Sequence, residues 1–228
     1  MRKSLLITLL SICTTIATGA AQAIIFQAHL THGQEVLNGG GQAVPIGEGS
    51  SGFAIFVLND TQTRLTYDVK LTGLDLGMVN TVPPTVPPGG PGDPGIGQTP
   101  FGAGTTADLN DDVFRGHIHR ALVGLNGGIV FGFIDQTIAL LNDQNDLQVD
   151  KAALHITGAW DLNEGNAGAN LGTELVNLFA GGLYINFHTR DHSGGEIRGQ
   201  ILRVPEPATL ALLSLGLVGI VGWRRKAS

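Results

Sequence analysis

Cysteine is almost missing from this 228-residue chain, and its scarcity removes several kinds of chemistry. The single cysteine, Cys13, lies in an apolar N-terminal run that follows Arg2 and Lys3 and leads to Ala21-Gln22-Ala23. A basic start, an apolar stretch and a small-residue cleavage site are typical of a secretory signal peptide, so we expect residues 1–23 to be removed. The exported protein then has no disulfide, no thiolate nucleophile and no cysteine ligand for zinc.

The sequence also lacks the motifs of common hydrolases and nucleotide-dependent enzymes. It contains no G-x-S-x-G element and no phosphate-binding glycine loop. Carboxylates such as Asp161 and Glu164 have no evident acid–base partner along the chain. These absences favour a protein without catalysis.

Basic residues are few in the body of the chain. Residues 24–204 contain 8 of the 13 Lys and Arg residues and 18 of the 19 Asp and Glu residues, which gives a net charge of −10. Such an acidic body argues against nucleic acid or an anionic lipid surface as a partner, and it favours solubility or association with cations. These 181 residues are the size of one domain.

A second apolar run lies at the C-terminus. Residues 208–223 are sixteen uncharged positions, slightly fewer than the ~20 that span a bilayer without tilt. Arg224-Arg225-Lys226 follows, and a basic cluster of this kind keeps its end of a membrane segment in the cytoplasm. By physical criteria alone this segment is a marginal anchor, for which we expect a transient membrane association.

Pro205-Glu206-Pro207 precedes that run, so a Pro-Glu-Pro motif, an apolar segment and a cluster with Arg224 and Arg225 follow one another. This order resembles the PEP-CTERM sorting signal of Gram-negative bacteria. The resemblance implies that residues 205–228 are a sorting and transmembrane segment, cleaved near Pro-Glu-Pro by a membrane exosortase. With signal peptidase acting at the other end, the protein is expected at the cell surface or in the extracellular matrix.

The clearest local pattern lies between residues 183 and 201. Apolar residues alternate with polar ones on both sides of a loop that ends in Gly194-Gly195: Leu183, Ile185, Phe187, Ile197 and Ile201. A period of two predicts a β-hairpin in which Phe187 faces Ile197 and Asn186 faces Arg198. We expect one face of this hairpin to lie in the core and the polar face to point outward.

The rest of the chain predicts an all-β protein. Further strands are expected at residues 24–30, 53–58, 65–71, 113–119 and 128–134. A short amphipathic helix is predicted over 171–179 with Thr173 as its cap, and residues 76–112, rich in Pro and Gly, are predicted to be a loop insertion. Many short strands and one short helix indicate an antiparallel β-sandwich.

Several motifs together resemble the CHRD domain, a module of chordin and of many bacterial secreted proteins. They are Phe26-Gln27-Ala28-His29-Leu30 with Gln34-Glu35-Val36, Gly116-His117-Ile118-His119, Leu183 to Thr189, and Gly195-Glu196-Ile197-Arg198-Gly199-Gln200. The resemblance covers residues 25–203 and implies an immunoglobulin-like or superoxide-dismutase-like sandwich. Two departures are the Pro/Gly insertion and Arg120-Ala121, where the family commonly has Gly-Pro.

His117 and His119 are the strongest candidates for metal ligands. Two residues apart on a strand, they point to the same face, and each imidazole can give one nitrogen to a copper or zinc ion. His188, on the polar face of its strand, is the best third ligand, and His192 in the adjacent loop is a weaker fourth. Copper-zinc superoxide dismutases also use an H-x-H strand, which is an analogy between folds.

A structural interpretation of these residues stays open. His188 can pair with Glu196 across the hairpin, and His117 and His119 can be half-exposed strand residues. Glu196 and Arg198 can hold a carboxylate or sugar, although strand alternation alone accounts for them. Two hypotheses follow: an exported, non-catalytic module that binds a surface polymer or protein, or a copper- or zinc-binding protein with superoxide-dismutase-like redox activity.

Overall fold

The computed structural model describes residues 23–36, 49–76, 112–135, 140–143, 146–166, 168–189 and 192–205. The strands are β1 (Ile24–Thr31), β2 (Ser51–Leu58), β3 (Arg64–Thr72), β4 (Asp75–Leu76), β5 (Asp112–Arg120), β6 (Ile129–Ile134), β7 (Gln148–Asp150), β8 (His155–Asp161), β9 (Leu183–Thr189), β10 (Ile197–Gln200) and β11 (Leu202–Arg203). A 3-10 turn, η1 (His32–Gln34), and one α-helix, α1 (Leu171–Phe179), complete the described part. The predicted all-β class with one short helix is confirmed.

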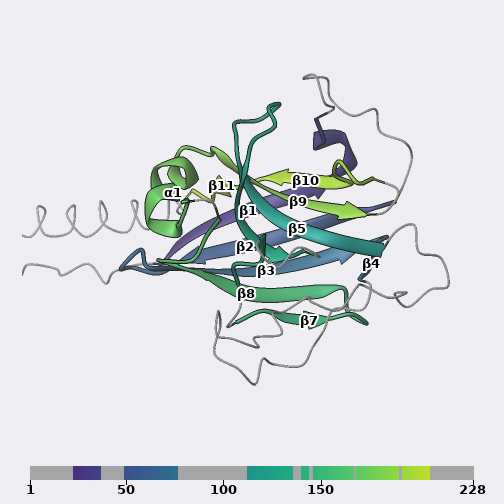
Figure 1. The fold of residues 1–228 in the computed structure, drawn as a ribbon, viewed down its shortest axis with the longest axis horizontal. Helices are drawn as coiled ribbons and strands as arrows, with labels where there is room; N and C mark the ends of the chain where they lie inside the picture. The colour runs from purple at the N-terminus through teal and green to yellow at the C-terminus, as the bar shows by residue number, and fades with distance from the viewer. Residues whose placement is uncertain are drawn as a thin grey trace, which may run out of the picture.

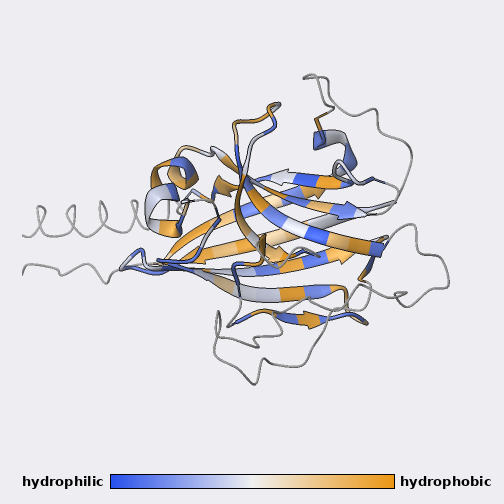
Figure 2. Cartoon of the chain, viewed as in Figure 1, coloured by the Kyte–Doolittle hydropathy of each residue, from blue (hydrophilic) through white to orange (hydrophobic). Residues whose placement is uncertain are grey.

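The strands form one sheet in the order β4-β5-β9-β10-β1-β2-β3-β8-β7, with β6 paired to β5 and β11 to β1 (Figure 1). Every pairing is antiparallel except that of β4 with β5. Hydrophobic and hydrophilic residues alternate along the strands, as Figure 2 shows, because successive side chains point to opposite faces.

The sheet is strongly curled. Phe133 on β6 contacts Phe187 on β9 and Tyr67 on β3, with ring centroids 5.5 and 5.3 Å apart. In the sheet order β9 and β3 are four strands apart, which in a flat sheet would separate them by about 19 Å. The sheet therefore wraps around β6, and its inner surface encloses a single core that includes the fully buried Trp160.

The hairpin β9–β10 has the predicted register. Phe187 is the partner of Ile197, Asn186 of Arg198 and Tyr184 of Gln200. Phe187 lies in the core with no exposed surface. The register follows from the alternation, since a slip of one residue would exchange the two faces.

The prediction that the polar face of this hairpin points outward is wrong. Asn186, His188 and Arg198 are 4, 8 and 2% exposed, and every residue of β9 is buried. Two distant segments cover the face: Arg198 donates to the carbonyl of Leu125, and Asn126 donates to the carbonyl of Val36. The C-terminal hairpin is therefore a central part of the sheet, buried on both sides.

Helix α1 spans the predicted residues, but its N-cap is Asn170, not Thr173. The Asn170 side chain accepts a hydrogen bond from the backbone N–H of Thr173, whose hydroxyl accepts one from the backbone N–H of Asn170. This reciprocal pair is a capping box, with Thr173 in its third position. Gly181, at φ +67°, follows the helix in a conformation that glycine favours.

Some predictions fall outside the described residues. They are the signal peptide at 1–22, the Pro/Gly-rich insertion at 77–111, and the sorting segment from Glu206 onward with Pro207, Arg224 and Arg225. Among the residues that are described, none belongs to a helix with the length and apolar character needed to cross a bilayer.

Candidate metal centre

The structure brings His117, His119 and His188 together. His117 and His119 lie two residues apart on β5, and His188 lies on the adjacent strand β9. The ring centroid of His117 is 5.6 Å from that of His119 and 5.6 Å from that of His188, and the third separation is 6.2 Å. One ring nitrogen from each residue lies within 4.8 Å of the other two. The pairing of β5 with β9 therefore creates the cluster predicted from the sequence.

Each imidazole has one nitrogen in a hydrogen bond and one without a partner. The bonded atoms are His117 Nε2 with Asp135 Oδ2 at 2.6 Å, His119 Nδ1 with the carbonyl of Gly127 at 3.0 Å, and His188 Nδ1 with the carbonyl of Ser193 at 3.0 Å. The remaining nitrogens are His117 Nδ1, His119 Nε2 and His188 Nε2, all buried and without a hydrogen-bond partner. A buried polar atom without a partner costs about 1–3 kcal/mol, and here three lie together.

The bonded nitrogens determine which atoms can bind a metal. A carbonyl oxygen only accepts hydrogen bonds, so His119 and His188 each carry a proton on Nδ1 and leave a lone pair on Nε2. His117 has the opposite arrangement, since Nε2 donates to the carboxylate of Asp135 and Nδ1 carries the lone pair. In the neutral form of each ring, the unpartnered nitrogen is therefore a Lewis base.

Burial keeps two of these imidazoles neutral. It lowers the pKa of His119 to about 3 and that of His188 to about 4. The neighbouring histidines act in the same direction, because one imidazolium in the cluster disfavours a second. Neutral imidazole is the form that binds a metal ion, so these two side chains are ready to bind at physiological pH.

The donor set fits zinc or copper. Three neutral imidazoles suit both ions, and three protein ligands with one open position are typical of catalytic zinc sites. At metal–nitrogen distances of about 2.0–2.1 Å, two ligands lie at most about 4.2 Å apart. Since the nitrogens spread over as much as 4.8 Å, metal binding would draw the three side chains slightly closer together.

The sequence analysis missed the hydrogen-bond partners of the cluster. Asp135 directly follows β6, and its carboxylate also lies 3.4 Å from Nε of Arg115. Gly127 and Ser193 contribute backbone carbonyls, which have no signature in a sequence. Asp135 could have been found from the sequence. It follows the strand next to the one with the H-x-H motif, and a carboxylate at that strand end can reach the histidines.

A stack of side chains supports His119. Its ring lies on that of Tyr184, with centroids 4.9 Å apart and an interplanar angle of 8°. The guanidinium group of Arg198 also packs on the ring of Tyr184, 3.4 Å from its centroid. Arg198 donates to the carbonyls of Leu125 and Leu122, in the segment that supplies Gly127. Arg198 is thus a structural residue of the site.

The side chain of His188 does not pair with that of Glu196, as the structural interpretation expected. His188 bonds to Ser193, while the carboxylate of Glu196 accepts a hydrogen bond from the hydroxyl of Thr189. His117 and His119 are 1 and 8% exposed, so neither is a half-exposed strand residue. The cluster is a buried feature of the sheet.

The remaining histidines lie outside the three-histidine cluster. His192, the weaker fourth candidate, packs against His32 with ring centroids 5.1 Å apart. His155 bonds to Asp68 near the surface, and His29 packs against Phe53. Among the described residues, the group that meets the geometry of a metal site is that of His117, His119 and His188.

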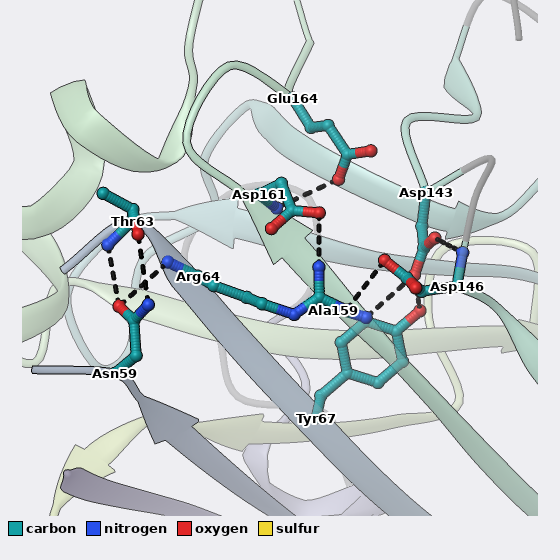
Figure 3. Close-up of polar contacts among 9 residues, drawn as sticks. All are labelled: Asn59, Thr63, Arg64, Tyr67, Asp143, Asp146, Ala159, Asp161 and Glu164. Atoms are coloured by element: carbon teal, nitrogen blue, oxygen red, sulfur yellow. Dashed lines mark hydrogen bonds and ion pairs between the residues drawn. The ribbon is translucent and has the colours of Figure 1, made fainter. Parts of the chain in front are cut away.

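A second polar cluster, on β3 and β8, is drawn in Figure 3. Arg64 bridges Asp146 and Asp161 at 2.9 and 2.6 Å, and the backbone N–H of Asp161 donates to Glu164. Tyr67 donates to Asp143, which also accepts from the backbone N–H of Ala159. Asp161 and Glu164 therefore have partners that the sequence did not reveal. A hollow of about 390 Å³ beside Arg64 and Tyr67 is lined by the Arg64–Asp146 pair together with apolar residues such as Ile55 and Val57.

The sequence was compared with models of known protein families. Residues 26–201 match the model of the CHRD domain. The chain belongs to the CHRD domain family. Residues 203–226 match the PEP-CTERM protein-sorting motif, which implies processing by exosortase and marks this CHRD protein as exported and associated with the cell envelope. No curated protein and no solved structure matched the chain.

Proposed function

We propose that this CHRD protein binds one copper or zinc ion through His117 Nδ1, His119 Nε2 and His188 Nε2. The observation that carries the proposal is the convergence of three buried nitrogens, each without a partner, from imidazoles whose other nitrogens are occupied. A metal ion satisfies all three lone pairs at once, whereas a water molecule can donate only two hydrogen bonds.

The partners of the three rings support the same conclusion. Each ring is fixed by a carboxylate or carbonyl on its far nitrogen, as is usual for histidines that bind metals. His117, with Asp135 behind it, forms a carboxylate–histidine pair that increases the basicity of the ligating nitrogen. The acidic body adds a long-range attraction for cations.

In this proposal the domain is a metal-binding module carried to the cell envelope by its sorting signal. Superoxide-dismutase-like redox activity is a second candidate if the ion is copper. The observation that favours it is Arg115, which pairs across the strands with His188 and has a side chain 37% exposed. A half-exposed cation beside the metal would attract a small anion such as superoxide.

Metal analysis of the exported protein, purified without a histidine tag, tests the proposal. We expect about one copper or zinc ion per chain in the wild type, and loss of most of it in His188→Ala and His119→Ala. His155→Ala is the matched control, because this histidine bonds to Asp68 outside the cluster. Equal metal content in all four proteins would contradict the proposal. A dismutase assay on copper-loaded protein, compared with Arg115→Ala, tests the redox candidate.

A further inference from the structure

Two more buried oxygens lack hydrogen-bond partners, one on Asn186 next to the histidines and one on Glu35, whose side chain contacts Asn186. They are Oδ1 of Asn186 and Oε1 of Glu35; the two residues are 4 and 5% exposed. Neither oxygen is needed to hold the imidazoles, whose bonded nitrogens contact Asp135, Gly127 and Ser193. Asn186 Oδ1 can only accept, and burying it without a donor is costly, which indicates a bound group that supplies the donor.

Asn186 lies on β9 directly opposite one of the proposed metal ligands. It is the direct partner of His117 across β5 and β9, and it precedes His188 by two residues on the same face of β9. Tyr184, two residues earlier again, carries the ring on which His119 is stacked. Asn186 therefore lies between Tyr184 and His188 along its strand and opposite His117 across it.

Glu35 is joined to Asn186. Its carboxylate accepts hydrogen bonds from the side chain of Asn186 and from the backbone N–H of Val36. Gly195 permits this contact, because a Cβ atom there would lie 2.5 Å from Glu35 Oε2 and 2.7 Å from Asn186 Nδ2. Gly195 also has φ +130°, a conformation that other residues rarely adopt. The backbone therefore leaves room for this pair of side chains.

The hydrogen bonds of this pair define the chemistry of what it can hold. With its N–H group directed to Glu35, the amide of Asn186 presents its oxygen, which only accepts. Burial raises the pKa of Glu35 to about 8, so near neutral pH its carboxyl group can take up or release a proton. A ligand that carries its own protons can donate to Asn186 Oδ1 and can donate to Glu35 or accept from it, whereas an aprotic anion leaves Asn186 Oδ1 without a donor.

We propose that Asn186 and Glu35 hold the ligand in the metal's fourth coordination position, and that this ligand is a small protic molecule, water or hydroxide, in preference to an aprotic anion. This inference rests on the metal site proposed above. It adds the residues that select what the metal can bind. Displacing an anchored water by a ligand that cannot reproduce its hydrogen bonds loses affinity.

Azide competition on the copper-loaded protein tests the inference. Azide has no proton to donate, and its charge-transfer absorption reports binding to copper(II). We expect Asn186→Leu to bind azide about 3- to 10-fold more tightly than the wild type, since the bound water loses one hydrogen bond of ordinary strength. Glu35→Gln removes the carboxylate with little change in shape and should shift azide affinity in the same direction.

Copper is measured on every sample, and azide affinity is expressed per bound copper. Asn177→Leu on α1 is the matched control and should keep the wild-type azide affinity, because Asn177 bonds to Glu174 and not to the site. Wild-type affinity in both Asn186→Leu and Glu35→Gln, with copper bound, would overturn this inference and leave the metal site standing. A wild-type protein that takes up no copper or zinc would overturn the metal site and this inference together. If Asn186→Leu does not fold, Glu35→Gln gives the decisive comparison.

Discussion

His117 Nε2 and Asp135 Oδ2 lie 2.6 Å apart, in side chains that are 1 and 0% exposed. This contact fixes the ring of His117 and leaves Nδ1 as its ligating atom. Because the carboxylate acts through the histidine, Asp135 is a positioning residue. Its replacement should weaken metal binding without removing a ligand.

Asp135→Asn tests this role. We expect metal affinity to fall about 10- to 100-fold, the usual effect of changing a residue that orients a ligand. Competition with a chelator of known affinity measures the change. His117→Ala should have a larger effect, and an affinity of Asp135→Asn equal to that of the wild type would show that the contact does not support the site.

The neutral state of the buried histidines gives the metal-free protein a characteristic pH dependence. His119 titrates at about 3 in the folded chain and near 6.5 when unfolded. Between these values the unfolded chain binds more protons, so the contribution of His119 to stability falls as pH drops below about 6.5. The slope is about 1.4 kcal/mol per pH unit. Chemical denaturation after chelation, compared with His119→Gln at pH 5 and 7, should show the wild type losing more stability; parallel losses would contradict this.

Glu35 produces a dependence of the opposite sign. Its pKa is about 8 when folded and about 4.5 when unfolded, so the folded chain binds more protons between these values. The contribution of Glu35 is fully present below about pH 4.5 and is lost as pH rises toward 8. Relative to Glu35→Gln, the metal-free wild type should become steadily less stable from pH 5 to 8, as measured by denaturation. A constant difference would show that Glu35 is ionised in the fold.

The polar cluster in Figure 3 should affect stability but not metal binding. Tyr67→Phe removes the hydroxyl that donates to the buried carboxylate of Asp143. We expect a loss of about 1–3 kcal/mol in the free energy of unfolding, because the buried carboxylate loses one of its donors and keeps only the backbone N–H groups of Ala159 and Asp146. Metal content should equal that of the wild type, because no residue of this cluster belongs to the three-histidine site. Loss of metal in Tyr67→Phe would contradict this expectation, because it would mean that the polar cluster and the three-histidine site are energetically linked.

Sequence patterns predicted the parts of the fold that depend on local periodicity. Alternation around Phe187 was sufficient for the register of the last hairpin, and the spacing of leucines located α1. The convergence of His117, His119 and His188 was also predictable, because two lie on one strand and the third on the polar face of another.

The surroundings of the site were not predictable for a physical reason. The polar face of β9 is covered by segments near Val36 and Leu125, which are about 60 to 150 residues away along the chain. Burial by such distant segments has no local periodicity. The carbonyl of Gly127 is likewise invisible in the sequence, since every residue carries one.

X-ray absorption at the metal edge of the loaded protein tests the central claim most directly. The account predicts three imidazole nitrogens at about 2.0 Å from a copper or zinc ion, plus one light atom from an exogenous ligand. His188→Ala should lose one imidazole from this shell, while His155→Ala keeps all three. A coordination shell made of carboxylate oxygens, or one unchanged in His188→Ala, would contradict the account.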